Sequence, residues 1–214
     1  MPRNKYPERT EQALLETAKR LFLERGYEHV TLQDIADACG LTRGAIYHHF
    51  RSKEEVVDAV TTRLFQETTP FARLREDPSL SGLERLRRLV TAGASHQEQL
   101  RLYAMLAPTF DQSPRLVSAY LLNCRNRVVP MLRELIAQGI ADGSIPAGDP
   151  DTLAEAAAVL TDILLSPLVF PGRRDAFLRR VRCAALMLEG AGLPLMDEAV
   201  TEAFQRMGAV LYPD

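Results

Sequence analysis

The side chains best suited to chemistry in this sequence are gathered within residues 31–53. The candidate DNA-contacting residues in and beside two short predicted helices are Thr31, Thr42, Arg43, Gly44, Ala45, Tyr47, His48, His49 and Lys53. A planar guanidinium such as that of Arg43 fits guanine O6 and N7, and a small residue such as Gly44 lets a helix lie deep in a major groove. Tyr47 and His48 suit contacts with phosphate and sugar. The set therefore points to double-stranded DNA as a partner.

Two further positions favour phosphate. Lys53 lies at the predicted start of a helix, where its own charge and the helix dipole both attract an anion. The Thr31 hydroxyl and the first amides of its helix offer a second phosphate contact. Two alternatives stay open: Arg43 can contact a base or a phosphate, and His49 can contact a phosphate or pack inward.

These side chains need two helices joined by a tight turn. Thr31 is predicted to cap the first helix, with Asp34 as its capping-box partner. Gly40 supplies the left-handed residue that ends this helix, and Thr42 caps the second helix, residues 43–49. Two helices joined by a turn that contains glycine form a helix-turn-helix, whose second helix enters the major groove.

The first quarter of the chain resembles the N-terminal domain of the tetracycline-repressor (TetR) family of bacterial regulators. The matching residues are Ala18, Leu21, Phe22, Gly26, Tyr27, Thr31, Ile35, Ala36, Gly40, Leu41, Gly44, Tyr47, Phe50 and Lys53. The resemblance implies an all-helical homodimer, a palindromic operator and a ligand pocket in the C-terminal domain. At His48–His49 many members have other residues, and this difference is expected to affect which operator sequence is bound.

No strand pattern occurs, so the predicted fold class is all-α. Residues 1–53 are expected to form a three-helix DNA-binding domain of the helix-turn-helix type, and residues 54–214 a helical ligand-binding and dimerisation domain. Helices are predicted over 8–25, over 53–74 after a Ser52–Glu55 capping box, over 83–106 before Pro108, over 115–141 with a kink at Pro130, and over 151–165, 173–189 and 198–211.

The helices 151–165 and 173–189 are rich in small and apolar residues, which allow close packing of helices. In the family that the N-terminal part resembles, such a pair forms the dimer interface, a four-helix bundle across a two-fold axis. The helix 198–211 looks like an addition to the usual family body.

Candidate ligand-binding residues lie in the C-terminal part. His96, Gln99 and Tyr103 are predicted to share one helix face, and Asn123, Arg127 and Met131 a second. A few polar groups in an apolar region are typical of a small-molecule site. Alternatively, these residues are exposed to solvent or bond to one another. Asp162 is either a dimer contact or an anion in the pocket.

Composition limits the other possibilities. The net charge of −2 and pI of about 6.1 argue against indiscriminate coating of nucleic acid, although Arg3 and Lys5 form a short basic arm. No signal peptide or membrane span is expected, and Cys residues without a CxxC pair suit a reducing cytoplasm. Cys39 is expected to be a small core residue, with a redox switch as a minor alternative.

Catalytic and metal-binding signatures are absent from the sequence. There is no GxSxG, P-loop, Rossmann or HExxH motif, and the His residues lack ligand spacing. We therefore expect no enzyme, no cofactor and no metal. The predicted function is a DNA-binding transcriptional regulator of the repressor type, which a small molecule releases from a palindromic operator. The alternative is a co-repressor-dependent regulator or an activator of the same fold.

Overall fold

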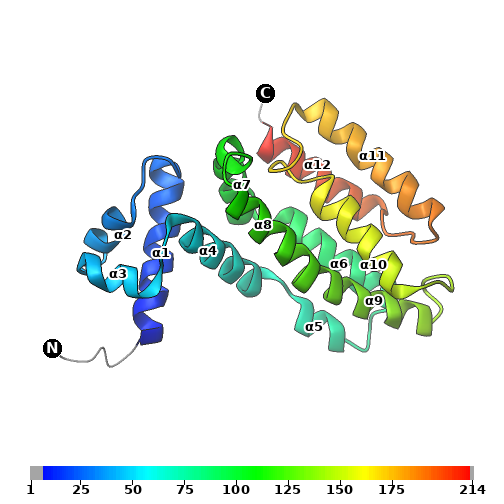
Figure 1. The fold of residues 1–214 in the computed structure, drawn as a ribbon. Helices are drawn as coiled ribbons and strands as arrows, with labels where there is room; N and C mark the ends of the chain where they lie inside the picture. The colour runs from blue at the N-terminus through cyan, green and yellow to red at the C-terminus, as the bar shows by residue number, and fades with distance from the viewer. Residues whose placement is uncertain (1–6, 213–214) are drawn as a thin grey trace.

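The computed structural model describes residues 7–212, with side chains described from Thr10 onward, and no strand occurs among them. The predicted all-α fold class is confirmed. The elements are α1 Pro7–Arg25, α2 Leu32–Ala38, α3 Arg43–His49, α4 Lys53–Thr68, α5 Phe71–Glu76, α6 Gly82–Ser95, α7 Gln97–Phe110, α8 Pro114–Asn123, a π-helical segment Cys124–Val128, α9 Val129–Ala141, α10 Pro150–Ala158, a second π-helical segment Val159–Ile163, α11 Arg174–Gly190 and α12 Glu198–Leu211. Helices α1–α3 lie at one end of the molecule, and α4 connects them with the remaining helices (Figure 1).

The predicted helix-turn-helix is confirmed in its local detail. The Thr31 hydroxyl accepts from the Asp34 amide at 3.1 Å, and the Asp34 carboxylate accepts from the Thr31 amide at 2.8 Å. Gly40 has φ +65°, which an L side chain rarely adopts, and Thr42 caps α3 by accepting from the Ala45 amide at 3.3 Å. The arm residues Arg3 and Lys5 lie outside the described residues.

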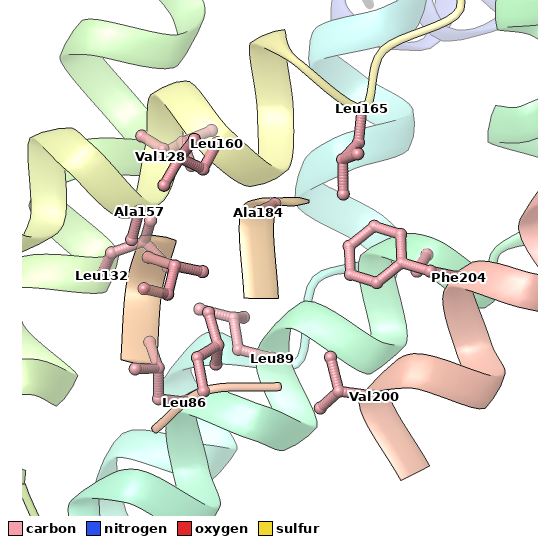
Figure 2. Packing of buried hydrophobic residues seen from close by; sticks show 14 of the residues in the cluster. Leu86, Leu89, Val128, Leu132, Ala157, Leu160, Leu165, Ala184, Val200 and Phe204 are labelled. Atoms are coloured by element: carbon pink, nitrogen blue, oxygen red, sulfur yellow. The ribbon is translucent and has the colours of Figure 1, made fainter. Parts of the chain in front are cut away.

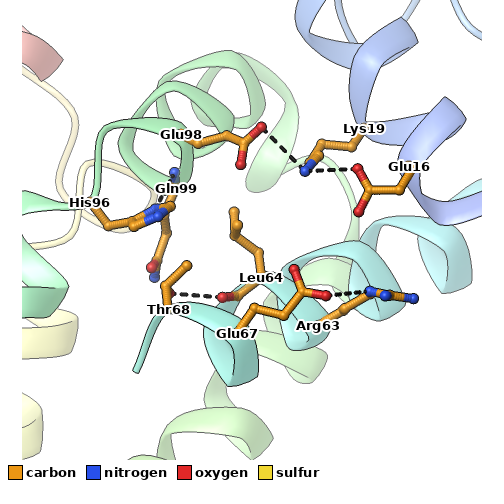
Figure 3. A network of polar contacts seen from close by, with 9 residues as sticks. All are labelled: Glu16, Lys19, Arg63, Leu64, Glu67, Thr68, His96, Glu98 and Gln99. Carbon is orange, nitrogen blue, oxygen red and sulfur yellow. Dashed lines mark hydrogen bonds and ion pairs between the residues drawn. The ribbon is translucent and has the colours of Figure 1, made fainter. Parts of the chain in front are cut away.

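The hydrophobic core beneath α1–α4 continues into the rest of the chain. Besides residues 14–64, this cluster contains Leu102, Leu106 and Phe110 of α7 and Leu116 of α8. Polar contacts follow the same junction: Lys19 of α1 pairs with Glu98 of α7 at 3.2 Å (Figure 3). The Tyr27 amide donates to Met105 Sδ at 3.2 Å, and Arg115 of α8 pairs with Glu55 of α4. The end of the molecule formed by α1–α3 therefore rests directly on α7 and α8.

Two predicted long helices are each divided in the structure, so both predictions were wrong. The helix over 53–74 ends at Thr68, because Pro70 has no amide hydrogen and disfavours helical geometry in the residue before it. The helix over 83–106 breaks at His96, which adopts an extended conformation and caps α7. Pro108 does not stop α7, because it lies in the last turn and removes only one hydrogen bond there.

The capping box predicted at Ser52 forms only in part. The Ser52 hydroxyl accepts from the Glu55 amide at 3.3 Å. The Glu55 carboxylate, however, accepts from the Arg51 amide at 2.6 Å, one residue before the position that a capping box requires.

Pro130 divides the predicted helix 115–141, as expected, through the π-helical segment Cys124–Val128. The Val129 amide bonds to the Cys124 carbonyl, which is a wider turn than in an α-helix. The wider turn lets the chain pass Pro130, which has no amide to donate. The predicted helices 151–165, 173–189 and 198–211 are confirmed as α10 with its π-helical extension, α11 and α12.

The C-terminal helices share one core. Leu86 and Leu89 of α6 face Val200 and Phe204 of α12, with Ala184 of α11 beside them (Figure 2). Helix α12 therefore packs as an integral wall of this part of the fold. The predicted boundary between two domains at residue 53 stays a prediction.

Candidate nucleic-acid interface and internal cavity

Helix α3 presents an exposed face above a buried anchor. Ile46 is fully buried, whereas Thr42, Arg43, Gly44, Tyr47 and His48 are exposed and Ala45 and His49 are partly buried. Because Ile46 fixes the helix against the core, the exposed face is held in one orientation.

Arg43 and Tyr47 lie on neighbouring turns of this face. The Arg43 guanidinium lies 5.5 Å from the centre of the Tyr47 ring, and Tyr47 is 46% exposed. Stacking of a guanidinium on an aromatic ring restricts both side chains. The pair therefore presents a flat cation and a phenol hydroxyl together to any molecule that contacts α3.

Lys53 makes contacts within the chain. Its Nζ donates to the Tyr27 carbonyl at 2.7 Å and lies 4.0 Å from the centre of the Tyr27 ring. These contacts tie the start of α4 to the loop between α1 and α2. The Tyr27 hydroxyl donates to Glu54, and burial together with this carboxylate raises the Tyr27 pKa. The phosphate contact of Lys53 stays a prediction.

Thr31 is exposed, but its hydroxyl has a partner in the structure. The hydroxyl donates to Asp34 Oδ2 at 2.6 Å, and hydrogen bonds from Thr31 lower the pKa of the Asp34 carboxyl. A phosphate at this helix terminus would meet that carboxylate, so the predicted Thr31 contact depends on the backbone amides.

The exposed position of Gly44 gives a prediction that separates binding from folding. A Cβ atom built at Gly44 has no neighbour within 4 Å. We expect Gly44→Ala to retain or slightly raise the midpoint of thermal unfolding, because alanine favours helix by up to about 1 kcal/mol. The same methyl group would hold α3 away from a groove and weaken duplex binding. Fluorescence anisotropy and thermal melts measure both effects; unchanged duplex affinity would contradict the placement of Gly44 at the DNA.

An internal cavity of about 110 Å³ lies among the helices that follow α3. The end of α4, helices α6 to α9, the second π-helical segment and α12 enclose it. Residues that line it are Phe65, Thr68, Thr69, Leu89, Val90, Gly93, Ala94, Gln99, Leu100, Tyr103, Tyr120, Val128, Met131, Leu132, Thr161, Asp162, Leu165, Ser166, Pro167, Phe204 and Met207. Its wall is apolar with a few polar groups, as in small-molecule sites generally.

Three of the predicted ligand-binding residues, Gln99, Tyr103 and Met131, line this cavity. Gln99 Nε2 donates to the Tyr103 hydroxyl at 3.0 Å. The other three residues lie elsewhere. His96 caps α7 by accepting from the Gln99 amide at 3.3 Å (Figure 3). Asn123 lines a smaller cavity of about 40 Å³ nearby, and Arg127 lines an open groove on the outside.

Sequence reasoning assigned no role to Tyr120 and left Asp162 undecided, yet both line the cavity. The Tyr120 hydroxyl donates to the backbone carbonyl of Asp162. The Cys124 thiol hydrogen-bonds to the Asp162 carboxylate, and burial raises the pKa of this carboxyl to about 6. The contact between Cys124 and Asp162 could not be predicted from α-helical spacing, because both residues lie in π-helical segments. Such segments shift side chains off the α-helical face.

The raised pKa of Asp162 predicts a pH-dependent stability. Above about pH 6 the folded protein must hold a desolvated carboxylate ion in the wall of the cavity, whereas in the unfolded chain an Asp is ionised above about pH 4. The carboxylate therefore destabilises the fold increasingly as the pH rises through this window. We expect Asp162→Asn to raise the free energy of unfolding at pH 7.5 by about 1–3 kcal/mol more than at pH 4.5. Urea titrations at the two pH values measure it; an equal effect at both would contradict the assignment.

Within residues 7–212, no helix is both long and apolar enough to cross a membrane. The same part of the chain contains no group of His, Cys, Asp and Glu that could hold a metal ion.

Comparison with known proteins gives a family match and a related repressor. Residues 14–60 match the model described as "Bacterial regulatory proteins, tetR family". The "HTH-type transcriptional repressor KstR2" of Mycobacterium tuberculosis is 37% identical over 136 residues. That match covers 61% of this chain and 66% of the repressor, slightly under two thirds of its length.

Solved structures extend the similarity over most of the chain. A transcriptional regulator of the TetR/AcrR family from Thermobifida fusca is 28% identical, with a TM-score of 0.56, and the match covers 84% of this chain and 97% of that one. A structure described as "SmeT-Triclosan complex" has a TM-score of 0.61 at 22% identity, covering 90% of this chain and 94% of that one. The second likeness shows a shared fold.

Proposed function

Since the chain belongs to the tetR family of bacterial regulatory proteins, we propose that it is a transcriptional repressor that binds a palindromic DNA operator and leaves it when a small molecule binds. The observation that carries the proposal is the exposed face of α3. Arg43, Gly44 and Tyr47 lie open on a helix that Ile46 fixes to the core. Arg43, at the start of this helix, contacts the edge of a base, while Tyr47 and His48 contact the phosphate and sugar of the DNA.

Binding to a palindrome requires two copies of the chain. The proposed interface is formed by residues 151–165 and 173–189, predicted above from their composition. Large apolar side chains on these segments are exposed in the single chain: Val159 is 54% exposed, Leu186 76% and Met187 53%. Burial of such side chains favours association. The two α3 helices then lie about 34 Å apart, or one further turn of DNA apart.

Release requires that the cavity communicate with α3. Phe65, Thr68 and Thr69, at the end of α4 and just after it, line the cavity, while Lys53 at its start contacts the loop between α1 and α2. A ligand that moves the end of α4 therefore moves the start of that helix and the position of α3. Coupling of about 1–3 kcal/mol is typical of such regulation. The ligand must bind the released state more tightly than the DNA-bound state.

The proposal places the chain in the cytoplasm, with operator DNA, a partly apolar effector and a second copy of itself as partners. A catalytic role has no support in the residues that line the cavity. The "SmeT-Triclosan complex" shows that another protein of the same fold holds a small molecule, which supports a ligand in this cavity by fold alone.

The experiment that tests the proposal is selection of bound duplexes from a random pool by the full chain. The salt concentration is fixed throughout, because phosphate contacts make affinity strongly salt-dependent. Enrichment of an inverted repeat is the expected result. Weak binding without enrichment would overturn the proposed DNA recognition. Screening small molecules for release of the enriched duplex then tests the regulation, and a molecule that strengthens binding would contradict release.

A further inference from the structure

The wall of the internal cavity carries one charged side chain. Among the described residues that line it, Asp162 is the single Asp or Glu, and none is Lys, Arg or His. The Cys124 thiol interacts with its carboxylate and lowers the pKa of that carboxyl. A thiol is a weak donor, and a carboxylate accepts several hydrogen bonds, so Asp162 retains accepting capacity.

Several polar donors of the wall are already engaged within the chain. The Tyr120 hydroxyl donates to the Asp162 carbonyl, and the Thr161 hydroxyl to the Ala157 carbonyl at 2.8 Å. The Thr68 hydroxyl donates to the Leu64 carbonyl at 2.7 Å. A ligand that approaches Asp162 therefore gains most if it brings its own donors and a positive charge.

Aromatic rings surround the same space. Phe65, Tyr103, Tyr120 and Phe204 all line the cavity. The Tyr103 and Tyr120 rings meet edge to face, with centroids 6.3 Å apart. The faces of such rings attract cations, and they do so more strongly when water is excluded. An anionic ligand would instead meet the Asp162 carboxylate without a cation to offset it.

We propose that the cavity binds an organic cation: a singly charged ammonium group that pairs with Asp162, on an apolar body that packs against the aromatic and aliphatic wall. This inference names the ligand class of the regulation in the proposed function, and so it rests on that function for its biological role. Binding itself does not depend on DNA, so the two can fail separately.

The test uses probes of equal length that differ in the head group: octylammonium, 1-octanol and octanoate. Calorimetric titration of the full chain without DNA at pH 7.5 is expected to give at least tenfold tighter binding of octylammonium than of the other two. Asp162→Asn is expected to lower the affinity for octylammonium at least tenfold and to leave the affinity for octanol within about threefold of the wild-type value. Asp111→Asn, which removes an exposed carboxylate beyond the end of α7, is the matched control and should change none of the three.

The pH dependence gives a second readout. Asp162 is faced by Cys124, Tyr103 and Tyr120, and burial raises the pKa of each of these groups, so they stay neutral below pH 8. The carboxyl pKa of about 6 then governs binding. Lowering the pH from 7.5 to 5 is expected to reduce the affinity of the wild type for octylammonium about tenfold and to leave the affinity of Asp162→Asn unchanged.

Three results would overturn the inference. They are octanol or octanoate binding as tightly as octylammonium, an unchanged cation preference in Asp162→Asn, and octylammonium affinity that does not fall at pH 5. None of these measurements contains DNA, so each leaves the proposed operator recognition standing. Conversely, cation binding without enrichment of an inverted repeat would remove the regulatory role and keep the ligand class.

Discussion

Replacing Arg43 and Tyr47 together by alanine is expected to lower affinity for the selected operator by about a hundredfold or more. The reason is that both side chains lie exposed on α3, stacked on one another, and contribute to no core contact. One good contact with a base contributes about 1–3 kcal/mol of discrimination, and a phosphate contact adds affinity that is independent of sequence. Fluorescence anisotropy at one salt concentration measures the loss.

The matched control is Arg20→Ala. Arg20 is an exposed arginine on α1 that pairs with Glu24, and its replacement removes the same charge away from α3. Both variants are expected to melt within a few degrees of the wild type, because exposed substitutions change stability by only about 0.5 kcal/mol. Equal DNA affinity of the double variant and the control would assign DNA recognition to some other surface.

Replacing Gly82 by alanine is expected to destabilise the chain by about 3 kcal/mol or more. A Cβ atom at Gly82 would lie 2.1 Å from the Gly139 amide nitrogen and 2.4 Å from its Cα. These are backbone atoms of α9, so no side-chain rotation relieves the overlap and the two helices must separate. The Gly82 amide also donates to Asp142 at 2.7 Å, a contact that the separation would weaken.

Gly93→Ala is the control for this prediction. Gly93 lies on the same helix α6, and a Cβ atom there has no neighbour within 4 Å. Alanine at this position should stabilise the helix slightly, by up to about 1 kcal/mol. Urea unfolding of the two variants gives the comparison. If Gly82→Ala were as stable as Gly93→Ala, the close contact of α6 with α9 would not exist in solution.

The N-terminal part of the fold was predictable because its signals are local. A capping box at Thr31, a glycine at the turn and a cap at Thr42 each specify backbone geometry within a few residues. Their order along the chain therefore predicted α2 and α3 closely, and the same kind of signal predicted α12 after Asp197. Which faces are exposed on α3 followed from the position of Ile46.

The cavity was less predictable because its residues meet through tertiary packing. The break at His96 removed that residue from the face of Gln99 and Tyr103, and neither proline nor glycine occupies the break itself. The π-helical segment that contains Asp162 changes the direction of its side chain, and an α-helical wheel does not show this change. Phe204 reaches the cavity only because α12 packs back on α6.

The most direct test of this account compares three duplexes at one salt concentration: the enriched inverted repeat, a single half-site and a scrambled sequence of equal length. Two copies that each present α3 should bind the repeat at least about a hundredfold more tightly than the scrambled duplex. Each repeat should hold two chains, and the affinity for the single half-site should be much lower than for the repeat. Equal affinity for all three duplexes would contradict sequence reading by α3 and leave only an electrostatic attraction to phosphate.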